Sequence, residues 1–239
     1  MIEAYNKDLD DFLTLGEGNA KEFALGLIAR MDECKSIDFS ENPNPKFSTN
    51  YLWGDARGMM FGVLECEDRK GDIIFLKAFS SQYNSEWHLE GWVDPLLDTK
   101  EFYRIVPPVD KKIKNIGKAL QDLQKGSDEY KALASQRKKL SQQLMDEIFD
   151  LYYLHNFCDE RKSLKEAFAE NRGIPTGTGE CCAPKLLNSA AIRGLKPLGL
   201  VEFYYGRENR SGSRIHGQFY DPCKEKCGPI LGFLLRGTE

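Results

Sequence analysis

The chain of 239 residues lacks long hydrophobic runs, because its uninterrupted apolar stretches are only a few residues long. Its first segment, Met1–Asp11, is acidic, whereas a secretory leader is basic and then apolar. A membrane-spanning helix needs about 20 predominantly apolar residues in succession. We therefore expect neither a signal peptide nor a spanning helix, and we predict a cytoplasmic protein without a membrane partner.

Basic residues are not in excess either. The chain has 33 Lys and Arg against 37 Asp and Glu, which gives a net charge of −4. A surface built throughout to neutralise phosphates depends on clustered Lys and Arg. The charge balance excludes such a surface, so any contact with nucleic acid must be local. Hydrophobic residues make up 41% of the chain, which is enough to bury a core.

Familiar catalytic signatures are scarce. The sequence has no visible Ser/His/Asp set, phosphate-binding loop or G-x-G-x-x-G after a strand. His88 and His155 each stand alone, and a lone histidine is more often a hydrogen-bonded structural residue than a catalyst. The seven cysteines form an odd number in a chain with no export signal, so thiols or metal ligands are expected in place of a disulfide framework.

Residues 1–108 alternate helical and β-rich patterns. Apolar spacing predicts short helices over Asp8–Leu15 and Ala20–Asp32. Two β-rich runs between Gly58 and Tyr83, joined by a polar turn, predict a hairpin, and His88–Val93 predicts a further strand. We interpret residues 1–108 as N-terminal helices and the β-hairpin half of an α/β domain.

Residues 109–157 change composition to Lys, Gln, Leu and Glu. Their apolar residues recur at three-four spacing, with a break at Gly126–Asp128 that suits a helix end and a new start. This predicts two long helices, the second reaching about Phe157, as an inserted hairpin or short coiled coil that is also a candidate homodimer contact. Arg137 and Ser141 lie in the seam and disfavour a long isolated coiled coil. For any single lysine a solvated helix face is the commoner role, but the candidate phosphate contacts are Lys111, Lys112, Lys114, Lys118, Arg137, Lys138 and Lys139.

The pattern of residues 158–239 predicts a loop followed by a helix, two strands and a final helix. The helices are expected over Pro184–Ile192 and Cys227–Leu235, and the strands over Leu198–Gly206 and His216–Tyr220. A sheet with helices laid on it is a layered α/β (α+β) domain. We expect residues 158–239 to be its second half, with the long helices inserted between the halves.

Four cysteines lie at the starts of the two predicted helices. Cys181 and Cys182 open one, and Cys223 and Cys227, spaced by one helical turn, open the other. Together with His216 as a further candidate, they are numerous enough for a tetrahedral zinc site. Helix N-termini also favour thiolates. Adjacent cysteines cannot easily face the same way, so we expect one ligand and one packed thiol in the first pair, and burial as small hydrophobes is the alternative for all four.

The order hairpin, helix, strand, helix resembles the zinc deaminase fold, in which one helix start with H-x-E or C-x-E faces another with P-C-x-x-C. This chain departs from that pattern in two ways. Its second motif, from Pro222 to Cys227, is one residue longer, and Ala183 stands where the proton-transferring Glu is expected. Glu180 is then the weak candidate for a catalytic proton carrier.

Three arginines occur in the connection between the two C-terminal strands. Arg207, Arg210 and Arg214 are accompanied there by one acid, Glu208. An Arg-rich loop can adapt to phosphates, so this connection is the stronger candidate for RNA contact.

Three stretches carry a family resemblance. They are G-T-G-E-C-C-A-P-K-L-L, G-L-K-P-L-G-L-V-E-F-Y-Y-G and H-G-Q-F-Y-D-P-C-K-E-K-C-G-P-I-L-G-F-L-L-R-G. The series resembles the N-terminal region of the long bacterial RNA pseudouridine synthases that act on large-subunit rRNA and tRNA. The resemblance implies an accessory domain that engages RNA beside a catalytic domain in cis or in trans. The family's catalytic H-R-L-D-x-x-T-S-G type motif does not occur between Met1 and Glu239, so this chain alone should not make pseudouridine.

Two other functions remain open from the sequence. One is a zinc-dependent nucleobase or nucleotide deaminase that uses the cysteines on zinc. The other is a protein-interaction module that acts through the long helices.

Overall fold

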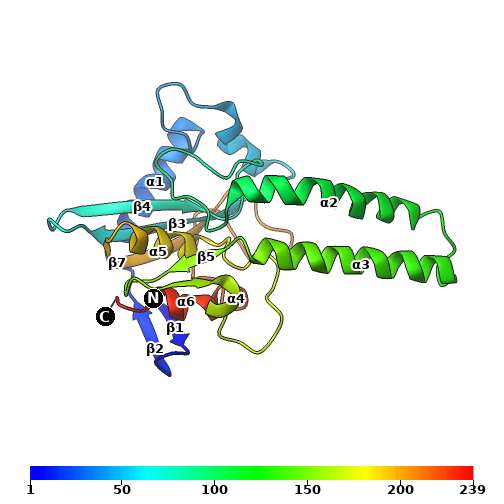
Figure 1. Ribbon diagram of the computed structural model, residues 1–239. Helices are drawn as coiled ribbons and strands as arrows, with labels where there is room; N and C mark the ends of the chain where they lie inside the picture. Colours follow the sequence, from blue (N-terminus) through cyan, green and yellow to red (C-terminus); the bar gives the residue numbers. More distant parts are fainter. Residues whose placement is uncertain (239) are drawn as a thin grey trace.

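The computed structural model describes residues 1–238 and shows a mixed α+β protein (Figure 1). Its elements, in chain order, are β1 (Ile2–Asn6), β2 (Asp11–Leu15), α1 (Ala20–Cys34), the 3-10 helices η1 (Pro45–Phe47) and η2 (Thr49–Trp53), β3 (Met59–Glu67), β4 (Ile73–Phe79), α2 (Thr99–Ala119), α3 (Asp128–Phe149), β5 (Tyr153–His155), β6 (Arg161–Ser163), α4 (Leu164–Ala167), α5 (Cys182–Ile192), β7 (Lys196–Tyr205), β8 (Phe219–Tyr220) and α6 (Gly228–Leu235).

The main sheet has the strand order β4-β3-β7-β8, and each neighbouring pair is antiparallel. Successive side chains of a strand point to opposite faces. On β3, Phe61 and Val63 join the buried cluster under α1, whereas Leu64 and Cys66 join the cluster under α5 and α6. The sheet is therefore covered on both faces, which confirms the predicted layered α+β arrangement and the predicted β3–β4 hairpin.

The N-terminal segment differs from the prediction. Asp8–Leu15 is not a helix, because residues 2–15 form the antiparallel hairpin β1–β2. Its first strand alternates buried and exposed residues, and the buried Ile2 and Ala4 pack in the cluster that contains α6. The long-range contact with the C-terminal helix overrides the helical spacing of this short window.

The predicted strand at His88–Val93 is also wrong. The segment is irregular, with Gly91 at φ 78°. Trp92 is nevertheless buried, and its indole N–H donates to the Ile37 carbonyl at 3.0 Å. The aromatic residues of this segment are thus core side chains supplied by a loop.

Helices α2 and α3 form an antiparallel arm that projects from the body (Figure 1). Helix α2 begins at Thr99, ten residues before the predicted start, because the Asp98 carboxylate caps it by accepting from the Lys100 and Glu101 N–H groups at 3.0 and 3.1 Å. Helix α3 ends at Phe149, before β5, and does not reach Phe157. In residues 1–238 no helix is both long and apolar enough to cross a membrane.

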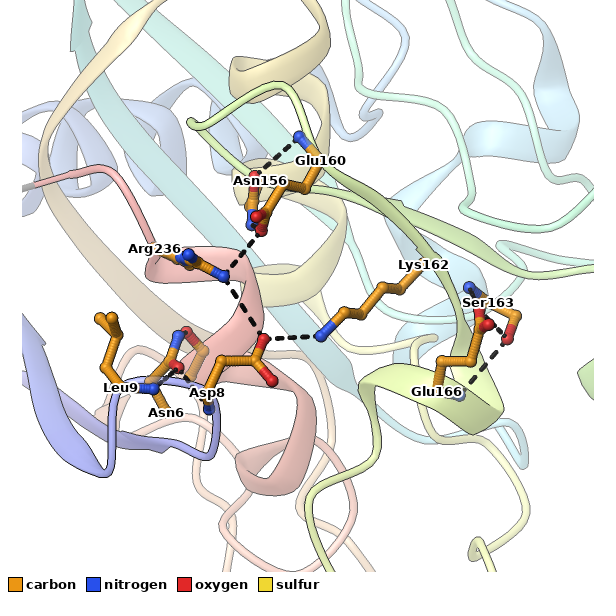
Figure 2. Close-up of polar contacts among 10 residues, drawn as sticks. Asn6, Asp8, Leu9, Asn156, Glu160, Lys162, Ser163, Glu166 and Arg236 are labelled. Atoms are coloured by element: carbon orange, nitrogen blue, oxygen red, sulfur yellow. Dashed lines mark hydrogen bonds and ion pairs between the residues drawn. The ribbon is translucent and has the colours of Figure 1, made fainter.

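A polar network ties the chain ends to the β5–β6 hairpin (Figure 2). The Asp8 carboxylate accepts from Lys162 Nζ at 2.6 Å and from Arg236 Nη1 at 3.5 Å. Arg236 also donates to Glu160 at 3.1 Å. The Lys162 hydrogen bond holds the pKa of Asp8 below its usual value. Residues 8 and 236 are therefore linked through charges on the same surface.

Helix α6 approaches β1 so closely that only glycine fits at the contact. A Cβ on Gly232 would overlap the Tyr5 carbonyl, and the Asn6 side-chain amide donates to the Gly232 carbonyl at 2.8 Å. We expect Gly232→Ala to lower the free energy of unfolding by about 1–3 kcal/mol, because the helix must move away from the strand. Urea denaturation measures this change.

Gly26 in α1 is the matched control, because a Cβ there would meet nothing within 4 Å. Gly26→Ala should raise the free energy of unfolding by about 0.5–1 kcal/mol. Equal effects of the two substitutions would contradict this packing.

Candidate functional site

The starts of α5 and α6 meet, as their cysteines show. Cys181 occupies the N-cap position of α5, and its thiol hydrogen-bonds to Cys223 and to Cys227, the N-cap residue of α6. We call Cys181, Cys223 and Cys227 the thiol cluster. More than 40 residues separate Cys181 from Cys223 in the sequence, so packing of α5 against α6 creates the cluster.

The local chain shapes the second half of the cluster. The Cys227 and Gly228 N–H groups both donate to the Cys223 carbonyl, at 3.2 and 2.9 Å. This tight turn directs the backbone N–H groups of residues 225, 226 and 227 toward the Cys223 sulfur. Such a ring of donors stabilises a negative sulfur.

The pKa values of the Cys223 and Cys181 thiols shift in opposite directions. The hydrogen bond from Cys181, aided by the backbone donors, lowers the pKa of Cys223 to about 5 against the opposing effect of burial. The hydrogen bonds of Cys181 to Cys223 and Cys227, together with burial, raise the pKa of Cys181 well above its usual value. At neutral pH the cluster therefore holds a Cys223 thiolate beside a protonated Cys181, and a thiolate is the form of cysteine that binds metals and attacks electrophiles.

Cys182, predicted as a metal ligand, lies outside the thiol cluster. It is fully buried, and its thiol donates to the Met60 carbonyl of β3 at 3.3 Å. A Cβ on Gly62 would lie 2.6 Å from the Cys182 Cβ, so glycine permits this close approach of α5 to the sheet. Cys182 therefore packs against the sheet, as expected for one of the two adjacent cysteines, and the thiol cluster is defined without it.

His216 is likewise placed away from the thiols. Its Nδ1 accepts from the Gly206 N–H at 3.2 Å, and its ring contacts Tyr205 and Trp53. Within residues 1–238, no three His, Cys, Asp or Glu side chains are arranged as a complete metal-binding group. The thiol cluster thus offers sulfur donors, and the metal remains a prediction.

Glu202 is a site residue that the sequence analysis missed. Only 3% of it is exposed, and its Oε1 accepts from the Ala183 N–H at 2.7 Å, so a carboxylate on β7 caps the start of α5. Burial raises the pKa of Glu202 to about 7, with a smaller contribution from Cys223. It also borders a pocket of about 310 Å³ with Tyr220 and Asp221. A lone Glu within the apolar run L-G-L-V-E-F-Y-Y was the available signal.

Glu180, the weak catalytic candidate, is held by two hydroxyl groups. Its Oε2 accepts from Ser81 Oγ at 2.7 Å and its Oε1 from the Tyr152 hydroxyl at 3.1 Å. Burial raises the pKa of Tyr152 far above its usual value, so this hydroxyl stays a donor. Glu180 is therefore directed at Ser81 and Tyr152, and Glu202 is the carboxylate whose charge acts on the thiol cluster.

Lys185 adds a buried cation on the inner face of α5. It is 1% exposed, its ammonium donates to the Phe79 carbonyl at 2.7 Å, and it lies 4.6 Å from the Phe79 ring centroid. Burial lowers its pKa to about 8. Because its hydrogen bond is to the sheet backbone, Lys185 joins the helix to β4.

The predicted arginine connection forms a basic surface with one exposed aromatic residue. Arg207 and Arg210 are exposed, and Arg214 lies over the Tyr220 ring at 4.1 Å. Trp53 is 48% exposed and contacts His216 of the same connection, at 5.1 Å between ring centroids. We call Arg207, Arg210, Arg214 and Trp53 the loop surface. The other predicted RNA contacts, Lys138 and Lys139, are exposed on α3.

Comparison of the chain with models of known protein families, with curated proteins and with solved structures found no match.

The unequal thiols lead to a prediction for chemical modification. A free cysteine has a pKa of about 8.5 and loses its reactive thiolate as the pH falls. Because the folded protein lowers the pKa of Cys223, that residue remains a thiolate at lower pH than a free cysteine does. In chelator-treated protein, lowering the pH from about 8 to about 6 should raise the ratio of alkylation at Cys223 to alkylation at the exposed Cys34. Peptide mass spectrometry measures the ratio. A ratio that decreases as the pH is lowered would contradict the lowered pKa of Cys223.

Proposed function

We propose that this chain is an RNA-engaging accessory domain of an RNA pseudouridine synthase. In this role it holds rRNA or tRNA for a catalytic domain that acts in cis or in trans, and it does not isomerise uridine itself. The quoted sequence resemblance supports the family. The observation that carries RNA engagement is the loop surface, where the exposed Arg207 and Arg210 share a strand connection with His216, the residue that the exposed Trp53 contacts.

The loop surface suits single-stranded or looped RNA. An arginine guanidinium group can donate two parallel hydrogen bonds to one phosphate, and an aromatic side chain can stack on any base. The connection is also anchored, because the Arg207 N–H donates to the Leu52 carbonyl at 2.9 Å and Arg57 donates to the Glu208 carbonyl at 2.8 Å. An anchored surface loses less conformational freedom when it binds.

The RNA contact is tested by reversing its charge. We expect Arg207→Glu, Arg210→Glu and Arg214→Glu together to weaken binding of a tRNA transcript at low salt by about tenfold or more, because phosphate contacts dominate such affinity. Fluorescence anisotropy measures the affinity. The matched control converts the exposed Lys7, Lys70 and Lys196 to Glu, with the same change in net charge. Equal losses in both triple variants would assign the effect to net charge and remove the loop surface from the proposal.

We further propose that zinc stabilises the domain at the thiol cluster. Three sulfurs suit zinc, and Glu202, which interacts electrostatically with Cys223, is a candidate fourth ligand. Bound zinc would supply a cross-link between the starts of α5 and α6. Helix α6 follows β8 and the loop surface, so this cross-link would stiffen the region that engages RNA.

Metal content gives a direct test of the zinc proposal. Protein purified without added metal should contain about one zinc per chain, and Cys223→Ser should abolish it, because structural sites depend on every thiolate. Cys34→Ser, at an exposed cysteine outside the thiol cluster, should leave the content unchanged. Mass spectrometry of metals in wild type and both variants provides the measurement. Absence of metal in wild type would reduce the cysteines to packing residues and leave the RNA proposal standing.

One observation favours a second candidate function, a zinc-dependent nucleobase or nucleotide deaminase with a deaminase-like arrangement of β3, β4, α5, β7 and α6. The buried Glu202 provides a carboxylate beside the thiol cluster, although Ala183 occupies the position expected for it. This candidate requires ammonia release from cytidine or adenosine substrates that Glu202→Gln abolishes. Zinc-loaded wild-type protein that releases no ammonia would eliminate it.

A further inference from the structure

The chain's charge is strongly segregated. Residues 111–139, the distal part of the α2–α3 arm, contain nine Lys and Arg against three Asp and Glu, a net charge of +6 in a chain whose total is −4. Figure 1 shows this part of the arm extending away from the body. The acidic remainder of the protein therefore carries a basic projection.

The basic residues converge on a groove in the arm. A pocket of about 740 Å³ is lined by Lys111, Lys114 and Lys118 of α2 and by Arg137 of α3. The three lysines occur at helical spacings of three and four residues, so they share one face over about 10 Å of axis. Arg137 reaches this face across Gly117, where a Cβ would lie 3.7 Å from its Nε. We call these four residues the arm groove.

Most of the arm groove's charge is unneutralised. Asp110 also lines the pocket, and it forms an ion pair with Lys114 at 2.6 Å. Over residues 1–238, Lys111, Lys118 and Arg137 have no ion-pair partner. All three side chains are exposed, so their charges are free to bind an anion.

We propose that the arm groove binds the phosphate backbone of RNA and forms a second contact beyond the loop surface. The inference rests on the proposed RNA-engaging function. Linear spacing of cations along a helix matches a chain of regularly spaced phosphates. The pocket lining is mostly polar and charged, with Pro107 as its one large apolar residue, so it offers little to an apolar protein partner. This contact is independent of base sequence and weakens as the salt concentration rises.

The test is a salt titration of tRNA binding by the full chain. Each phosphate contact contributes about 0.7–0.9 to the slope of log affinity against log salt concentration. Lys111→Gln, Lys118→Gln and Arg137→Gln together should therefore reduce the magnitude of the slope by about 2–3. The matched control neutralises Lys100, Lys125 and Lys131, which lie on the same arm outside the pocket lining. The control variant should change the slope by less than half as much as the arm-groove variant does. Circular dichroism tests whether both variants retain the fold.

The outcomes separate this inference from the proposed function. If wild-type protein binds RNA and the loop-surface variant weakens binding, but the arm-groove variant behaves like its control, the inference is overturned while the RNA-engaging function stands. The arm would then be assigned to an acidic protein partner. If wild-type protein binds no tRNA or rRNA fragment at low salt, both proposals fail.

Discussion

Pairing of β3 with β7 at the centre of the sheet is the interaction on which the rest of the structure depends. The two strands are antiparallel neighbours from Met59–Tyr205 to Glu67–Lys196. Phe61 and Phe203 lie opposite each other, with stacked rings 5.7 Å apart. A β-bulge between Glu65 and Cys66 interrupts this pairing, and bulges redirect side chains. Glu65 there accepts from the Asn19 N–H at 2.6 Å, which fixes the start of α1 on one face of the sheet.

The other face of the same strands positions the candidate site. Glu202 of β7 caps α5 from the sheet, and Lys185 of α5 donates to the backbone of β4. Buried charged groups are costly unless they are hydrogen-bonded, so both groups hold α5 in one position. That position sets Cys181 against α6, and the thiol cluster follows from it. Loss of the β3–β7 register would disperse the capping carboxylate, the thiols and the anchored loop surface together.

The sequence predicted the elements whose patterns are long and agree with their tertiary surroundings. α1, the β3–β4 hairpin, α5, β7 and α6 are of this kind. The helix predicted over Asp8–Leu15 failed because an eight-residue window contains too little periodicity to outweigh packing against α6. The start of α2 was misplaced because Pro107 and Pro108 normally mark a helix boundary, whereas here both lie inside the helix.

Site residues were predictable only where chemistry is visible in one segment. The paired cysteines and the arginine connection are local signals, so the sequence analysis could select both as candidates. Glu202 acts on the start of α5 from a different strand, which no single segment reveals. The directions in which the Cys181 and Cys182 thiols point depend on the packing of α5. Their adjacency therefore predicted one thiol in the site and one in the core, but not which of the two faces the sheet. The arm groove needs the pairing of α2 with α3 to bring Arg137 beside Lys118.

The central claim is that RNA binds this domain at local basic surfaces on an otherwise acidic chain. Chemical modification of arginine and lysine side chains in the presence and absence of bound tRNA, quantified for each residue by mass spectrometry, tests it most directly and without substitutions. The account predicts that RNA protects Arg207, Arg210 and Arg214 of the loop surface and Lys111, Lys114 and Lys118 of the arm groove, and leaves Lys7, Lys70 and Lys196 unprotected. Uniform protection of all these residues, or protection confined to Lys7, Lys70 and Lys196, would contradict it.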